Sequence, residues 1–208
     1  MPAPNNRVDD VRFIGALSGR YALSERKAPG SDVLPVFACR LCSISPSQAV
    51  MIGPELPALG ESVALHSPEF GLLRGRTTRL GGDSFAIDFD IDEGEREKLT
   101  AKIRWKKANV HRPHADKRDY PRSLPRRPRT LLTLRDGTRV ACFLIDISRS
   151  GAAVSAKVQP PPGTVLAVGA LWGKVVRALE VGFAFEFLEV QGIDALEQRL
   201  LEPPAPLR

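Results

Sequence analysis

Aromatic residues and cysteines are scarce in this sequence. Its 208 residues include nine Phe, two Trp, two Tyr and three Cys. Cores of this composition must be mostly aliphatic, and a small, odd number of cysteines argues against a disulfide framework. No apolar run approaches the roughly 20 residues of a membrane helix, and the N-terminal stretch MPAPNNRVDD lacks the pattern of a secretory signal. We therefore expect a soluble protein of the reducing cytoplasm.

Positive charge is present but unevenly distributed. Between Lys102 and Arg139 there are thirteen basic and three acidic residues, a balance of +10. The whole chain has 30 basic and 24 acidic residues, so the remainder has 17 and 21, a balance of −4. A basic segment in an otherwise mildly acidic chain indicates either an anionic partner, such as a nucleic acid, a membrane surface or a phosphate ligand, or a solvated linker.

The sequence contains an internal repeat. Three pairs of segments match in the same order, the first at an offset of 103 residues and the other two at an offset of 98: Cys39–Met51 with Cys142–Val154, Gly75–Leu80 with Gly173–Ala178, and Ser84–Phe89 with Gly182–Phe187. Because the matched segments keep their order and the offset between them changes only once, we infer two copies of one domain.

Each copy has the pattern of a small antiparallel β-barrel followed by a short helix. In the second copy the pattern predicts strands over 129–134, 139–147, 152–156, 165–168, 171–179 and 181–190, with turn residues between them. Asp136-Gly137 is a hairpin signal. Asp92 with Glu95, and Asp194 with Glu197, have the spacing of helix capping pairs. We predict a mainly β protein with domains at 1–108 and 129–208, joined by a basic, proline-rich linker at 109–128.

The two copies differ at a few chemically distinctive positions. Where the second copy has Asp146 and Gly151, the first has Ser43 and Gln48. A carboxylate among isoleucines requires a partner or costs free energy if it is buried alone. The arginine-rich stretch RDYPRSLPRRPR also precedes only the second copy, which suggests that these features form one site.

The chemistry of these residues suits a guanine nucleotide with several phosphates. Arg118 and Arg122 have the spacing R-x-x-x-R, and guanidinium groups bind phosphate and guanine as a fork. The Asp146 carboxylate can accept hydrogen bonds from a guanine edge, and Ser148 can donate to a phosphate. Gly151 lets the backbone approach a ligand without a Cβ atom.

The sequence R-x-x-x-R followed by D-x-S-x-x-G on a small β-barrel resembles the PilZ domain, a family that binds the bacterial second messenger cyclic di-GMP. The resemblance implies a tandem PilZ-domain protein that takes cyclic di-GMP as its ligand and has no cofactor. It also implies a downstream protein partner in motility or exopolysaccharide regulation. The ligand-binding residues it implies are Arg118, Arg122, Asp146, Ser148 and Gly151.

The first copy departs from this family pattern. It has Arg12, but the position four residues earlier is Val8, and of the second motif only Ser45 remains. The resemblance therefore implies a degenerate first domain. In the second copy the pairs Arg118/Arg122 and Arg122/Arg126 both fit the arginine motif; we prefer the first pair. Three further arginines are candidates for accessory phosphate contacts: Arg126, Arg127 and Arg129.

Other motifs are explained more simply without a functional site. Cys39 and Cys42 are expected to be ordinary half-buried thiols, and His111 and His114 have no neighbouring Cys or carboxylate with which to hold a metal. We expect Trp172 in a barrel core. No catalytic triad or phosphate-binding loop occurs in the sequence, so we expect no enzyme.

We expect Lys117–Arg129 to be mobile before the ligand binds and then to fold over the second barrel, changing the arrangement of the two domains. Two alternatives remain open. The chain could be a PilZ-like interaction module that binds no nucleotide, or it could bind nucleic acid through its basic linker. The scarcity of aromatic residues disfavours the nucleic-acid binder.

Overall fold

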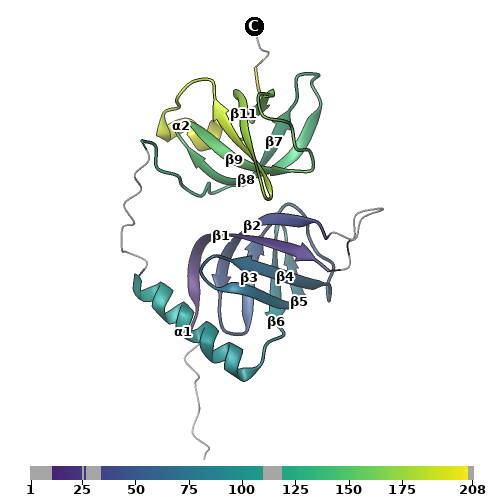
Figure 1. The fold of residues 1–208 in the computed structure, drawn as a ribbon, viewed down its shortest axis with the longest axis vertical. Helices are drawn as coiled ribbons and strands as arrows, with labels where there is room; N and C mark the ends of the chain where they lie inside the picture. Colours follow the sequence, from purple (N-terminus) through teal and green to yellow (C-terminus); the bar gives the residue numbers. More distant parts are fainter. Residues whose placement is uncertain (1–10, 25, 27–33, 110–118, 206–208) are drawn as a thin grey trace, which may run out of the picture. The chain divides into compact units, whose positions relative to one another are not determined.

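The computed structural model describes residues 11–24, 26, 34–109 and 119–205. The described chain divides into two compact units, each built around one closed, six-stranded antiparallel barrel (Figure 1). The fold class expected from the sequence is confirmed. Within the described residues, no helix is both long and apolar enough to cross a membrane.

The first barrel has strands ordered β1-β2-β3-β6-β5-β4 around the ring. Their bounds are β1 (Phe13–Leu23), β2 (Val36–Ile44), β3 (Gln48–Ile52), β4 (Ser62–Ser67), β5 (Gly71–Gly81) and β6 (Ser84–Phe89). Helix α1 (Glu93–Asn109) follows β6 and places Leu99 and Ile103 in buried positions.

The second barrel repeats this order as β7-β8-β9-β12-β11-β10. Its strands are β7 (Arg129–Thr133), β8 (Arg139–Ser148), β9 (Gly151–Ala156), β10 (Val165–Val168), β11 (Leu171–Leu179) and β12 (Gly182–Phe187), and α2 (Ile193–Arg199) follows. β12 is shorter than the expected strand 181–190. The expected hairpin joins β7 to β8, with Gly137 at φ 84° and the Leu134 N–H donating to the Thr138 carbonyl.

Irregularities recur at matched positions in the two barrels. The register of β2 against β3 shifts at Cys42, and the register of β8 against β9 shifts at Ile145. A second shift occurs between Thr77 and Arg79 on β5 and between Val175 and Arg177 on β11. Because β-bulges insert a residue and bend a strand, bulges at repeat-related positions show that the copies share backbone geometry as well as sequence.

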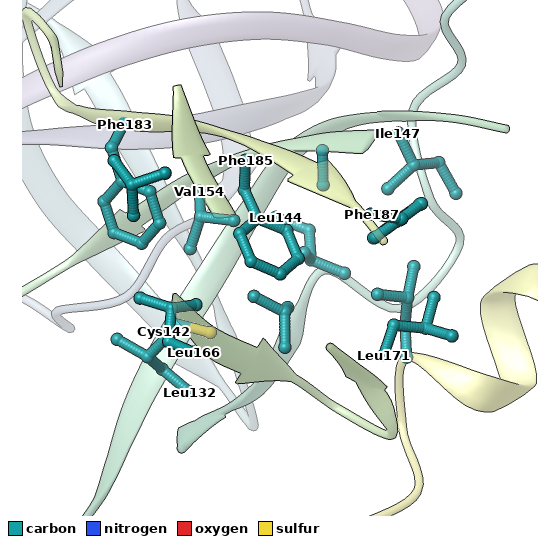
Figure 2. Packing of buried hydrophobic residues seen from close by; sticks show 14 of the residues in the cluster. Leu132, Cys142, Leu144, Ile147, Val154, Leu166, Leu171, Phe183, Phe185 and Phe187 are labelled. Carbon is teal, nitrogen blue, oxygen red and sulfur yellow. The ribbon is translucent and has the colours of Figure 1, made fainter. Parts of the chain in front are cut away.

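The second barrel is filled mainly by aliphatic side chains and three phenylalanines of β12. Figure 2 shows Phe183, Phe185 and Phe187 in this cluster beside Leu144 and Ile147 of β8. Phe185 and Phe187 meet edge to face, with ring centroids 5.7 Å apart. Trp172 is half-buried and its indole N–H donates to the Ala205 carbonyl at 2.8 Å, so the expectation that it lies in the core was wrong.

The two expected helix caps have different outcomes. The Glu95 N–H donates to the Asp92 carboxylate at 2.8 Å, and the Asp92 N–H donates to the Glu95 carboxylate at 3.3 Å. This is the expected reciprocal cap. At α2 the N-cap is Gly192 and makes no side-chain hydrogen bond, so the cap expected from Asp194 and Glu197 was wrong.

Candidate functional site

The bulge in β8 places Asp146 at the barrel surface. Leu144 and Ile147 are buried, whereas the two residues between them, Ile145 and Asp146, are half-buried. In a regular strand alternate residues share a face, but an extra residue lets two consecutive side chains lie on the outer side. The carboxylate therefore sits among isoleucines in the sequence without being sealed inside the core.

The chain before β7 runs alongside β8. We call residues 119–128 the arm. Ser123 and Ile147 exchange backbone hydrogen bonds of 2.8 and 2.9 Å, and the Leu144 N–H donates to the Pro128 carbonyl at 2.6 Å. Buried prolines at 125 and 128 interrupt strand pairing between these contacts. In this structure the arm pairs with the barrel through these contacts, and its mobility before ligand binding stays a prediction.

This pairing brings Arg122 next to Asp146. The Nη1 atom of Arg122 lies 3.2 Å from Oδ1 and 3.1 Å from Oδ2 of Asp146, so one nitrogen contacts both carboxylate oxygens. The side chains are 35% and 25% exposed. An ion pair this accessible to water contributes little to stability, on the order of 0–1 kcal/mol. Its groups remain within reach of an anionic or guanine-bearing ligand.

The Ser148 hydroxyl takes part in the turn between β8 and β9. It lies 3.3 Å from the Ser150 hydroxyl and donates to the Gly151 carbonyl at 3.3 Å. Ser45 makes the same two contacts in the first barrel, to Ser47 and to the Gln48 carbonyl. The retained serine is thus explained by the turn that both copies form.

Gly151 has a packing reason for lacking a side chain. A Cβ atom at this position would lie 2.2 Å from the Phe185 carbonyl oxygen of β12. Non-bonded atoms do not approach so closely, so a side chain here would force β9 and β12 to shift, and the neighbouring strand favours glycine. In the first barrel the matched Gln48 instead donates through its side chain to Asp88 of β6 at 2.8 Å.

The remaining candidate arginines have different positions. Arg118 lies outside the described residues. Arg126 is exposed, and its backbone N–H donates to the Glu197 carboxylate at 3.2 Å. Glu197 is the residue that was expected to help cap α2. Arg127 in the arm and Arg129 at the start of β7 are also exposed. Of the candidate residues, the structure brings Arg122, Asp146, Ser148 and Gly151 to one end of the second barrel.

Two residues at this end were not singled out from the sequence. Tyr120 belongs to the arm, and Arg149 belongs to the turn that holds Ser148. The Arg149 guanidinium carbon lies 5.3 Å from the centre of the Tyr120 ring. Comparison of the copies contained a signal for Arg149, because its match in the first copy is Pro46.

The cysteines have the properties of structural thiols. Burial raises the pKa of Cys142 to about 12 and also raises the pKa of Cys42, where the nearby Arg40 charge acts in the opposite direction. Such thiols stay protonated and unreactive at neutral pH. Among residues 11–24, 26, 34–109 and 119–205 no group of three or more His, Cys, Asp or Glu is arranged to hold a metal ion. His111 and His114 lie outside those ranges.

The first barrel has a cavity of its own, of about 540 Å³. Residues of α1 form most of its wall, and Val11 and Pro46 complete it. Arg96 and Arg104 are balanced there by Glu93 and Glu97. None of the candidate ligand residues lines this cavity, and its mixed charge gives no preference for an anion.

A comparison with protein-family models gives a match for the second barrel. The PilZ domain family model matches residues 116–202. No match was found among curated proteins.

Solved structures that are similar to the chain include the following three. The PilZ domain of CeSA from a cellulose-synthesizing bacterium has 14% identity and a TM-score of 0.36, covering 47% of this chain and 97% of its own. The PlzA protein of Borreliella burgdorferi, in complex with c-di-GMP, has 13% identity and a TM-score of 0.29, covering 89% and 87%. The inhibitor of motility of Bacillus subtilis has 13% identity and a TM-score of 0.28, covering 91% and 94%.

The fold and the repeat define a protein of two tandem β-barrels with the same strand order and matched bulges. The second barrel, with the arm that precedes it, is a PilZ domain. The first barrel is a degenerate copy of that domain, since it keeps the topology and Ser45 but lacks the carboxylate and the glycine.

Proposed function

We propose that this protein is a receptor for cyclic di-GMP and that the ligand binds to the arm and the adjacent end of the second barrel. The observation that carries the proposal is the pairing of Arg122 with Asp146 inside a match to the PilZ family. A guanidinium that recognises phosphate and a carboxylate that recognises a guanine edge lie side by side. Both are partly exposed, so a nucleotide can reach them.

Each candidate residue has a distinct role in this proposal. Arg122, with Arg118 preceding it, binds phosphate and the guanine O6/N7 edge. Asp146 exchanges its contact with Arg122 for the guanine N1–H and N2–H₂ donors, or shares both. Ser148 and Gly151 shape the turn from which Asp146 projects, and Ser148 can also donate to a phosphate. Arg126, Arg127 and Arg129 add positive charge that attracts the ligand from a distance.

The arm is also part of the connection between the two barrels, so we propose that ligand binding changes the domain arrangement. Small-angle scattering with and without cyclic di-GMP tests this part separately. An unchanged scattering curve at saturating ligand contradicts the rearrangement while leaving binding intact.

In the proposed role the protein acts as a receptor and catalyses no reaction. The principal alternative is an interaction module that binds no nucleotide. The retained Arg122 and Asp146 argue against that alternative, because a module without a nucleotide has no need of this partly exposed pair. A nucleic-acid binder using the basic segment is a further alternative, and salt-sensitive binding to any duplex DNA would be its signature.

Calorimetric titration of the full chain with cyclic di-GMP tests the proposal. We expect saturable heat for the wild-type protein and for Ser43→Ala and Gln48→Ala, which alter the matched positions of the degenerate barrel. Cyclic di-AMP is the matched control ligand, because it has the same phosphates without the guanine edge. An absence of heat at high micromolar cyclic di-GMP, or equal affinity for both dinucleotides, would count against the proposal.

A further inference from the structure

Arg149 connects the motif turn of the second barrel to the arm. It lies between Ser148 and Ser150, and its side chain is exposed. Its guanidinium carbon is 5.3 Å from the centre of the Tyr120 ring, within the range of a cation–π contact. Tyr120 is half-buried and lies two residues before Arg122 in the arm.

The position of Arg149 is fixed by the segment that follows β12. Its Nε donates to the Gln191 carbonyl at 2.8 Å, and the Gln191 N–H donates to the Arg149 carbonyl at the same distance. Gln191 is only 6% exposed, and its side-chain oxygen accepts a hydrogen bond from Arg199. A long flexible arginine is thus held in place before it meets the tyrosine, which lowers the entropy cost of the contact.

The turn itself does not require an arginine. The first barrel forms the matched turn with Pro46 at this position, and Ser45 makes the same hydroxyl contacts as Ser148. The comparison of the copies therefore indicates that the serine is needed to form the turn and that the arginine is not. On the arm, the residue that Arg149 contacts is Tyr120.

We propose that Tyr120 and Arg149 form a clasp that holds the arm on the second barrel and positions Arg122 for the ligand. The effect of the clasp on nucleotide affinity rests on the proposed function; the clasp itself does not. Both are positioning residues. They act by raising the fraction of molecules whose arm is already in the binding geometry, and the apparent affinity is proportional to that fraction.

The arm amides give a direct measurement of the clasp. Ser123 and Ile147 exchange backbone hydrogen bonds across the arm and β8, so their amide hydrogens exchange with solvent when the arm opens. For the full chain we expect Tyr120→Ala and Arg149→Gln to speed this exchange roughly two- to fivefold, the factor that an exposed cation–π contact supplies. Tyr120→Phe keeps the ring and should exchange at the wild-type rate.

Coupling between the two residues separates a clasp from two unrelated defects. If they act through each other, Tyr120→Ala combined with Arg149→Gln should open the arm no more than either change alone. The Val175 N–H of β11 donates to the Thr164 carbonyl, and β11 lies across the barrel from β8. Its exchange reports opening of the whole barrel, and its rate should be the same in all variants. Multiplicative effects in the double variant, or unchanged exchange at Ser123 and Ile147, would overturn the clasp.

Titration with cyclic di-GMP then tests the link to binding. We expect Tyr120→Ala to weaken binding measurably, by a factor up to that seen in amide exchange, and Tyr120→Phe to bind like the wild type. A faster-opening arm with unchanged affinity would overturn the positioning role. If the wild-type protein gives no heat with cyclic di-GMP, the proposed function fails, and the exchange measurements still decide whether the clasp exists.

Discussion

Gly151 of β9 and Phe185 of β12 approach so closely that a Cβ atom at position 151 would lie 2.2 Å from the Phe185 carbonyl oxygen. The D-x-S-x-x-G pattern suggested that the glycine makes room for a ligand. In the folded barrel it makes room for the neighbouring strand. Loss of this glycine would therefore damage the barrel first, and the ligand site only as a consequence.

We predict that Gly151→Ala destabilises the second barrel by about 2–3 kcal/mol, the upper part of the range for overpacking, because the obstructing atom belongs to the backbone. Chemical denaturation of the full chain measures the change. Gly192→Ala is the matched control: nothing lies within 4 Å of its added Cβ atom. Replacing this N-cap glycine should cost less than about 1 kcal/mol. Equal stability of the two variants would contradict the packing explanation.

The pair Arg122–Asp146 should matter far more for the ligand than for stability. At 35% and 25% exposure, we expect Arg122→Ala or Asp146→Ala to change the free energy of unfolding by no more than about 1 kcal/mol. Each should weaken cyclic di-GMP binding by about 2–3 kcal/mol, since charge-assisted hydrogen bonds to the ligand are lost. Denaturation and calorimetry on the same protein samples give both values.

Arg177→Ala controls for the loss of one positive charge, because this exposed arginine lies on β11 outside the candidate site. It should leave the affinity within about a factor of two, as expected for a screened, distant charge. If Arg177→Ala weakened binding as much as Arg122→Ala, the basic charge of the domain, and not the pair, would be responsible.

Strand positions were largely predictable because the repeat supplied two versions of the same pattern. Val165–Val168 and Leu171–Leu179 were expected with the bounds that the structure has. The bulges at Cys42 and Ile145 were not expected, since a bulge arises from the pairing of two strands and leaves no periodicity in one. That omission concealed how Asp146 reaches the surface.

The site was predictable where the copies differ in chemistry and unpredictable where the reason is tertiary. Asp146 and Gly151 stood out against Ser43 and Gln48, but the strand that makes Gly151 necessary is 34 residues further along the chain, at Phe185. Arg149 differed from its counterpart, Pro46. Its contact with the Tyr120 ring is tertiary, however, and only the folded structure shows it.

The helix caps offer a test of the same distinction. Asp92→Ala removes the acceptor of the Glu95 N–H and should destabilise the first unit by about 1 kcal/mol. Asp194→Ala has the same sequence context, but the N-cap of α2 is Gly192 without a side-chain hydrogen bond. We therefore expect a change within about 0.5 kcal/mol, as for an ordinary surface substitution. Similar losses in both variants, measured by denaturation, would show that α2 is capped as the sequence suggested.

The buried thiol of Cys142 should make the second barrel sensitive to alkali. Burial raises its pKa from 9.0 to about 12 in the folded protein, so the unfolded chain loses this proton first. The favourable contribution of the protonated thiol is complete below about pH 9 and is lost as the pH rises toward about 12. In that window the free energy of unfolding should fall by up to about 1.4 kcal/mol per pH unit from this group.

Denaturation curves of the wild type and of Cys142→Ala at about pH 8 and about pH 10.5 isolate this contribution. A Trp105→Phe background leaves Trp172 as the only tryptophan, so its fluorescence reports the second barrel. Whatever the stability of the alanine variant at about pH 8, the gap between the two proteins should narrow as the pH rises, since alanine has no proton to lose. Parallel pH dependence would mean that Cys142 ionises as readily in the folded barrel as in the unfolded chain.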